Sequence, residues 1–271
     1  MPSPRPREHV LYDEPEPCPY LPGRMARMPL RLQLRPLQPA AFDELLAQGD
    51  RRVGQMLYRT ACGSCAACEP LRLPVAAFAP TRSQRRALQK NRDVVVEAGP
   101  ATYTAEKLAL YNRHKRERGL SHSDEPMTRS SYEGWFLSTC VTTVEMRYLV
   151  DGRLIGVGIL DLGEQDASSV YFYFDPDEAP RSLGVFSALM ELAWLRSRGG
   201  RYLYMGLWVE DCRHLYYKAG YAPHERRIGG EWQRFDAPAP ARRFPGGDED
   251  DAPEAPDAPA GPDAPPGPSS G

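Results

Sequence analysis

Residues 144–174 read VEMRYLVDGRLIGVGILDLGEQDASSVYFYF and contain the clearest structural signal in the chain. Apolar side chains alternate with polar ones at the start of this segment, at Val144, Met146, Tyr148 and Val150. Asp151-Gly152 is typical of a two-residue hairpin turn, and residues 154–160 supply the returning strand. Residues 169–174 supply a third strand, so the segment predicts an antiparallel meander.

The flanking segments extend this pattern to an acyltransferase architecture. Apolar residues recur at helical spacing over 181–198, and the strand at 202–207 that follows predicts a crossover. Upstream we expect a strand at 94–97, a helix over 104–118 and a helix from about Ser130, where Ser130-x-x-Glu133 offers a capping box. Downstream we expect a short helix over 212–219 and a strand ending at Phe235. The α/β (α+β) order is that of the GCN5-related N-acetyltransferases.

Composition divides the 271 residues into four segments. Residues 236–271 hold 10 of the 28 prolines and 8 Asp or Glu against 2 Arg, which predicts a disordered acidic tail. We expect a flexible N-terminus (1–17), a small cysteine-containing domain (18–92), the acyltransferase domain (93–235) and this tail. No apolar run is long enough for a membrane span or a signal peptide, so we expect a cytoplasmic protein without a membrane partner.

Three of the six cysteines stand at Cys62, Cys65 and Cys68, and Cys18 lies in a loop made rigid by two prolines. Thiolates at this spacing suit a zinc ion or an iron–sulfur cluster, with Cys18 as fourth ligand. Redox-active thiols and buried structural cysteines are the alternatives, and Cys140 and Cys212 fit the last.

A helix over residues 82–91 would place four basic side chains on one face, at Arg82, Arg85, Arg86 and Lys90. Such a ridge, with Arg51, Arg52 and Arg59 upstream, suits the phosphates of a nucleic acid or an acidic group, although a solvated helix face has the same pattern. Arg181-Ser182-Leu183-Gly184 resembles the start of the turn that binds the coenzyme A pyrophosphate. Phe186 stands where that turn needs a glycine, so we expect an acyl donor other than acetyl-CoA.

Five blocks together resemble the aminoacyl-tRNA-protein transferases: CPYLPGR (18–24), YRTACGSCAAC (58–68), RSQRRALQKN (82–91), SSVYFYFDPDEAPRSLGVFSAL (168–189) and YLYMGLWVEDCRHLYYKAGYAPHE (202–225). The first two resemble the bacterial branch, which transfers leucine to N-terminal Asp or Glu and so marks proteins for degradation. The fourth is also close to the arginyl-transferring branch. Thr60, where the bacterial pattern has proline, and His214-Leu215, where it has Lys-Met, leave the donor amino acid open.

The resemblance implies charged tRNA and proteins beginning with Asp or Glu as partners. Because an aminoacyl ester is already activated, positioning and a proton acceptor suffice for transfer, and no cofactor is required. We expect Asp175, and then Asp161, to hold or deprotonate the attacking amine, although a turn carboxylate before Pro176 explains Asp175 equally well. Tyr204 and Lys218 would orient the ester or the terminal adenosine. The remaining substrate and tRNA contacts are assigned to Arg59, Arg82, Arg85, Arg86, Lys90, Arg181 and Trp208.

The resemblance leaves two other hypotheses. An ordinary coenzyme A acetyltransferase has the same order of elements. A metal- or redox-sensing module would bind tRNA through the cysteine segment and the ridge and transfer nothing.

Overall fold

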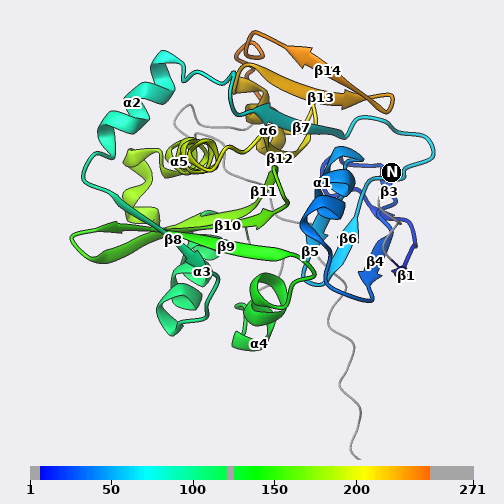
Figure 1. The fold of residues 1–271 in the computed structure, drawn as a ribbon, viewed down its shortest axis with the longest axis horizontal. Coiled ribbons are helices and arrows are strands. Elements are labelled where there is room, and N and C mark those ends of the chain that lie inside the picture. The colour runs from blue at the N-terminus through cyan, green and yellow to red at the C-terminus, as the bar shows by residue number, and fades with distance from the viewer. Residues whose placement is uncertain (1–6, 121–124, 245–271) are drawn as a thin grey trace, which may run out of the picture.

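An eight-stranded mixed sheet forms the centre of the computed structural model, which describes residues 7–120 and 125–244 (Figure 1). Its strands, in spatial order, are β14 (Glu231–Phe235), β13 (His224–Ile228), β7 (Glu69–Pro74), β12 (Tyr202–Trp208), β11 (Ala167–Phe174), β10 (Arg153–Leu162), β9 (Thr142–Val150) and β8 (Val95–Pro100).

The predicted meander is confirmed as β9, β10 and β11. Leu154 pairs with Leu149 and Gly158 with Met146, so the hairpin closes at Asp151-Gly152. Both turn residues have positive φ, 49° and 78°, as a primed two-residue turn requires. The alternation of apolar and polar residues in β9 therefore agrees with the register in which β9, β10 and β11 pair.

Helices cover both faces of the sheet (Figure 1). Helix α5 (Leu183–Ser197) and α2 (Arg82–Lys90) lie on one face, while α3 (Ala105–Glu117) and α4 (Arg129–Tyr132) lie on the other. One core therefore joins Phe186, Leu189 and Leu192 to the sheet, and a second core packs Tyr111, Phe136 and Tyr173 beneath it. The capping prediction at Ser130 is wrong: the Thr128 hydroxyl caps α4 by accepting from the Ser131 N–H.

A second, smaller sheet is built from the N-terminal third of the chain. It contains β1 (Glu8–Tyr12), β4 (Leu30–Gln33), β6 (Met56–Tyr58) and β5 (Arg51–Val53), next to α1 (Pro39–Ala47) and the short pair β2 (Glu16–Pro17) and β3 (Met25–Ala26). The expectation of a flexible N-terminus is therefore corrected for residues 7–17, because β1 pairs with β4 from Glu8 onward. Residues 1–6 lie outside the described part.

Two features join the two halves of the molecule. Strand β7, which sequence patterning did not indicate, comes from the cysteine-containing segment and lies between β12 and β13. Strands β11 and β12 form a parallel ladder of only two pairs, Ala167–Leu203 and Ser168–Tyr204. Beyond those pairs β12 is held by β7 instead, and its end turns toward the short helices α6 (Arg213–Tyr216) and η3 (Tyr217–Gly220).

The start of the acidic tail packs on the body, contrary to the prediction of disorder. The Ala239 N–H donates to the Ala219 carbonyl, and Phe244 packs edge-on against Tyr216 with ring centroids 5.5 Å apart. Arg242 pairs with Asp211 at 2.8 Å. The rest of the predicted tail, 245–271, lies outside the described residues. Among the helices that are described, none has the length and apolarity to cross a membrane.

Candidate functional site

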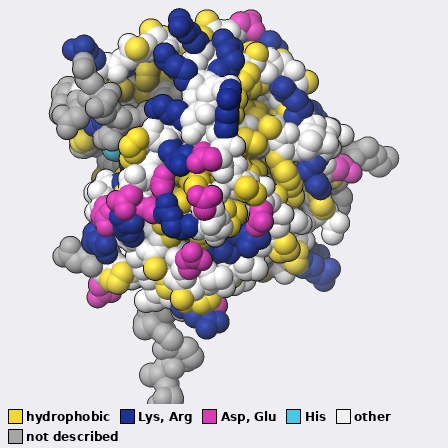
Figure 2. Space-filling model, turned by 90° about the vertical axis from the view of Figure 1, so that its left-hand side faces the viewer, with side chains coloured by type: hydrophobic (Ala, Val, Ile, Leu, Met, Phe, Trp, Pro, Cys, Tyr) yellow, Lys and Arg dark blue, Asp and Glu magenta, His cyan; other side chains and the backbone are white. Residues whose placement is uncertain are grey.

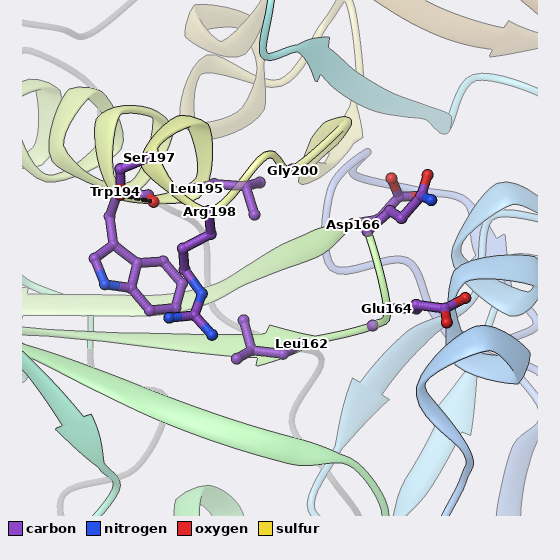
Figure 3. Close-up of a pocket in the computed structure, with 10 residues that line it drawn as sticks. Leu162, Glu164, Asp166, Trp194, Leu195, Ser197, Arg198 and Gly200 are labelled. Carbon is purple, nitrogen blue, oxygen red and sulfur yellow. Dashed lines mark hydrogen bonds between the residues drawn. The ribbon is translucent and has the colours of Figure 1, made fainter.

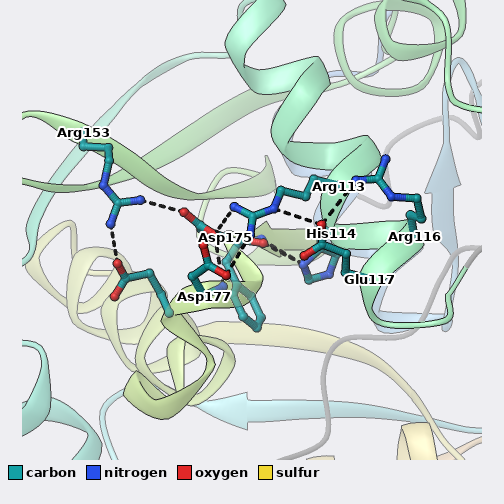
Figure 4. A network of polar contacts seen from close by, with 9 residues as sticks. Arg113, His114, Arg116, Glu117, Arg153, Asp175 and Asp177 are labelled. Atoms are coloured by element: carbon teal, nitrogen blue, oxygen red, sulfur yellow. Dashed lines mark hydrogen bonds and ion pairs between the residues drawn. The ribbon is translucent and has the colours of Figure 1, made fainter.

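Asp175, predicted to act on the amine, ends β11 within a network of ion pairs (Figure 4). One carboxylate oxygen accepts from Arg113 at 2.7 Å and the other from Arg153 at 2.6 Å. The first oxygen also accepts from the Asp177 N–H at 3.1 Å, which caps the 3-10 helix η2 (Pro176–Arg181). These contacts are those of the turn carboxylate that was the alternative for Asp175.

Asp161 is further from solvent and is also fully bonded. Its side chain and that of Arg52 are both 0% exposed and pair at 2.5 Å. The second carboxylate oxygen accepts from the Thr143 hydroxyl at 2.7 Å. Because Arg52 belongs to β5 and Asp161 to β10, the pair holds the small sheet on the large one. This geometry corrects the catalytic assignment of Asp161 to a structural one.

The basic ridge forms as predicted on α2, with Arg82, Arg85, Arg86 and Lys90 all exposed. Figure 2 shows Lys and Arg side chains gathered over this part of the surface, with acidic side chains mostly below them. The C-terminal end of the ridge meets another predicted residue, since the Lys90 Nζ donates to the Pro180 carbonyl and Arg181 donates to the Lys90 carbonyl.

Arg181 is held in place by two carboxylates, Asp93 at 2.8 Å and Glu178 at 2.6 Å. The turn after it differs from a glycine-rich phosphate turn, because Ser182 takes a positive φ of 57° and Phe186 is buried in the core under α5. Because the Phe186 ring packs into the core, it does not crowd this turn, and an acyl donor other than acetyl-CoA stays a prediction.

Tyr204 and Trp208 lie on β12 beside arginines that sequence reasoning missed. Arg72 of β7 donates to the Tyr204 hydroxyl at 3.0 Å and stacks 3.7 Å from the Tyr202 ring centroid. Burial raises the pKa of Tyr204 to about 12. Trp208 donates from its indole nitrogen to the Tyr216 carbonyl, and Arg226 lies 4.2 Å from its ring. Both aromatic side chains are buried, and their hydrogen bonds connect β12 to β7 and to α6.

Lys218, unlike Asp161 and Asp175, has no oppositely charged partner among the described residues. Its side chain is 2% exposed, and its Nζ donates to the Leu207 carbonyl at 3.0 Å. Burial lowers the pKa of Lys218 well below its usual value, and the positive charge of Arg51 lowers it further.

Arg51 also belongs to this site, although the sequence indicated it only as one of the basic residues upstream of the ridge. Its guanidinium lies directly over Gly206, where the backbone takes a φ of +92° and a Cβ would overlap the side chain. Its Nη1 is buried without a hydrogen-bond partner in the described structure. The glycine in the middle of an apolar strand, YLYMGLW, was the available signal, because such a glycine often marks a close approach.

Several cysteines lie near the end of β12. Cys18, Cys65 and Cys68 pack against an apolar group that includes Leu207 and Cys212, so Cys212 also belongs to this neighbourhood. Burial and the neighbouring thiols Cys18, Cys62 and Cys65 raise the pKa of Cys68 to about 12.

The donor chemistry of these thiols suits zinc or an iron–sulfur cluster. Within residues 7–120 and 125–244, however, no three metal-ligating side chains are arranged around a common point. Arg59, predicted to contact substrate, is partly exposed beside this region with its Nε 3.8 Å from Asp50.

A pocket of about 400 Å³ lies at the opposite end of α5 from Ser182 (Figure 3). Trp194 and Arg198 line it from the helix, while Glu164 and Asp166 line it from the turn between β10 and β11. None of the predicted site residues lines it, and Asp166 is paired with Arg201 at 2.9 Å.

Comparisons with known proteins match about four-fifths of the chain. The family model for the N terminus of arginine-tRNA-protein transferase matches residues 16–86, and the model for its C terminus matches residues 106–228. An aspartate/glutamate leucyltransferase of Chromobacterium violaceum is 34% identical over 83% of this chain and 93% of its own length. One of Aeromonas hydrophila is 37% identical over 81% and 92%. The crystal structure of FemX aligns with a TM-score of 0.42 and 8% identity over 74% of this chain and 79% of its own.

Proposed function

This chain belongs to the arginine-tRNA-protein transferase family, and we propose that it transfers leucine from leucyl-tRNA to the α-amine of proteins that begin with Asp or Glu. The observation that carries the proposal is the likeness to aspartate/glutamate leucyltransferases, at 34% and 37% identity over more than nine-tenths of their length. The arrangement of β9 to β12 with α5, an acyltransferase fold, supports the same chemistry.

The reaction exchanges an ester for an amide. The α-amine nitrogen attacks the aminoacyl carbonyl carbon, the C–N bond forms, and the C–O bond to the ribose of the terminal adenosine breaks. The amine loses a proton, and the ribose oxygen gains one. The enzyme therefore has to position two substrates and accept a proton, and it needs neither a nucleophile of its own nor a cofactor.

Lys218 is the residue best suited to accept that proton. A general base must be uncharged when it acts, and burial beside Arg51 favours the uncharged form of Lys218. The hydrogen bond to the Leu207 carbonyl uses an N–H of the amine and fixes its position. Asp175 and Asp161, by contrast, already neutralise arginines.

The tRNA lies, in this proposal, along α2. Arg82, Arg85, Arg86 and Lys90 are exposed and suit the phosphates of the acceptor stem. Lys90 and Arg181 meet where the ridge reaches the start of α5, which places cationic groups beside the end of β11.

The cysteine cluster is a separate proposal and enters no step of the transfer. We propose that Cys18, Cys62, Cys65 and Cys68 bind zinc or an iron–sulfur cluster. Metal analysis and visible absorption of the purified protein test this: Cys68→Ser should lose the bound metal, and Cys140→Ser should keep it. Metal-free wild-type protein with four titratable thiols in this segment would contradict it.

Transfer assays test the function itself. Labelled leucine and labelled arginine, each on its own tRNA, are offered with peptides that differ only in a first residue of Asp, Glu, Ala or Lys. Leucine entering the Asp and Glu peptides alone is the expected result. Label from arginyl-tRNA would instead assign arginyl transfer, and no label from either tRNA would favour a tRNA-binding module without transferase activity.

A further inference from the structure

Two neighbouring arginines of β5 are in opposite electrostatic states. Arg52 is fully buried and neutralised by Asp161 at 2.5 Å. Arg51, one residue earlier and half-buried, has no carboxylate partner among the described residues, and its Nη1 is buried without a hydrogen bond. A titratable side chain in its surroundings is Lys218, which is an amine and not a carboxylate.

An isolated cation of this kind is costly to bury unless it is paired. The lowered pKa of Lys218 makes its charged form less favourable, whereas an arginine side chain cannot be deprotonated in proteins. Arg51, which is half-buried and pairs with no carboxylate among the described residues, can therefore accept an anion supplied from outside the protein. Gly206 makes this position of Arg51 possible, because a Cβ there would overlap the guanidinium that lies against the β12 backbone.

We propose that Arg51 binds the side-chain carboxylate of the acceptor's first residue and so selects Asp and Glu. The proposal rests on the proposed function, since it names the residue that reads the acceptor. A guanidinium donates two parallel hydrogen bonds to a carboxylate, which a neutral Asn or Gln side chain cannot accept in the same way.

The position of Arg51 favours a single carboxylate over a tRNA phosphate. Arg51 is partly covered, close to the partly buried Tyr20 and to the apolar group around Leu207 and Val209. The ridge on α2 has the opposite character, since its four cations are exposed along one helix face and suit a phosphodiester backbone. The two kinds of anion thus have separate places on the protein.

The proximity of Lys218 connects recognition to chemistry. Arg51 lowers the pKa of Lys218, so a carboxylate bound to Arg51 offsets that effect. Lys218 then accepts a proton from the neighbouring α-amine more readily when the acceptor is acidic. We therefore expect Asp and Glu to be preferred in kcat as well as in KM.

The test compares peptides that begin with Asp and with its neutral isostere Asn, for wild type, Arg51→Gln and Arg51→Lys. Wild type should favour the Asp peptide in kcat/KM by at least about 30-fold, equal to about 2 kcal/mol of discrimination. Arg51→Gln should bring the ratio close to 1, while Arg51→Lys keeps part of it. Arg35→Gln, which removes one exposed positive charge from the same half of the chain, should keep the full ratio.

Peptide binding without tRNA, measured by fluorescence anisotropy, separates the possible failures. If wild type transfers nothing but Arg51→Gln still loses the preference for binding the Asp peptide, the proposed function fails and the carboxylate site stands. An Arg51→Gln protein that folds as wild type by thermal melting and keeps its Asp preference overturns the site. Weakened tRNA binding with unchanged peptide preference would assign Arg51 to a phosphate instead and also overturn it.

Discussion

The ends of two adjacent strands, β11 and β12, differ in how their charges are matched. At the end of β11, Asp175 meets Arg113 and Arg153, and Glu178 meets Arg153 and Arg181, so each charge has a partner within the protein. At the end of β12, Arg51 and Lys218 lie together, and neither pairs with a carboxylate within residues 7–120 and 125–244. Matched charges at the first end hold a turn, while unmatched charges at the second indicate a site for substrate.

Replacing Lys218 should produce the largest effect on activity. Lys218→Met keeps the length of the buried chain and removes the proton acceptor, so kcat should fall by about 100-fold or more. Because a deprotonated lysine is required, the wild-type rate should rise with pH through the pKa of Lys218, which lies below the usual lysine value. Single-turnover transfer over a pH series measures both effects.

Lys218→Arg distinguishes the base from a mere cation, because an arginine cannot accept the proton. A Lys218→Arg enzyme with near-wild-type kcat would contradict the assignment. Asp177→Asn, on a 75% exposed side chain of the matched network, serves as the control and should keep kcat.

Breaking a matched pair should cost stability. Asp161→Asn leaves the Arg52 guanidinium buried without its counter-charge, and such a loss costs about 3–5 kcal/mol of unfolding free energy. Urea denaturation measures it, with the exposed Asp177→Asn again as the matched change, expected within about 1 kcal/mol of wild type. Equal effects of the two substitutions would remove the distinction between the buried and the exposed pair.

Glu191 is a buried carboxyl group without a basic partner among the described residues, and protonation can neutralise it. Burial in the core under α5 raises the pKa of Glu191 to about 7 from 4.5. The folded protein therefore holds a proton that the unfolded chain loses. Between pH 4.5 and 7 stability falls as pH rises, by up to about 3 kcal/mol. Glu191→Gln should flatten this part of the pH–stability curve, and a wild-type curve that is already flat there would contradict the assignment.

Sequence patterning predicted the meander, the crossover and the ridge because each depends on local periodicity. It missed β7, because the alternation of apolar and polar residues in 69–74 is short. The backbone of this segment is paired on both sides, by β12 and by β13, which are distant in sequence. It also assigned Asp161 and Asp175 to catalysis, since a carboxylate at a strand end has the same sequence whether or not an arginine meets it. Arg52 pairs with Asp161 across 109 positions of sequence, and only the fold brings them together.

The ridge on α2 gives the smallest expected effect and extends the comparison to the surface. Arg86 is exposed and has no hydrogen-bond or ion-pair partner among the described residues. Arg85, by contrast, donates to the Pro80 carbonyl. If α2 carries tRNA, Arg86→Ala should weaken tRNA binding by about 1 kcal/mol and reduce the slope of log Kd against log salt by about 1. Filter binding at several salt concentrations measures the slope, and Arg35→Ala should leave it unchanged. A weaker affinity with an unaltered slope would mean that Arg86 acts through the packing of α2 on α5 and contacts no phosphate, because only a lost phosphate contact changes the number of ions released.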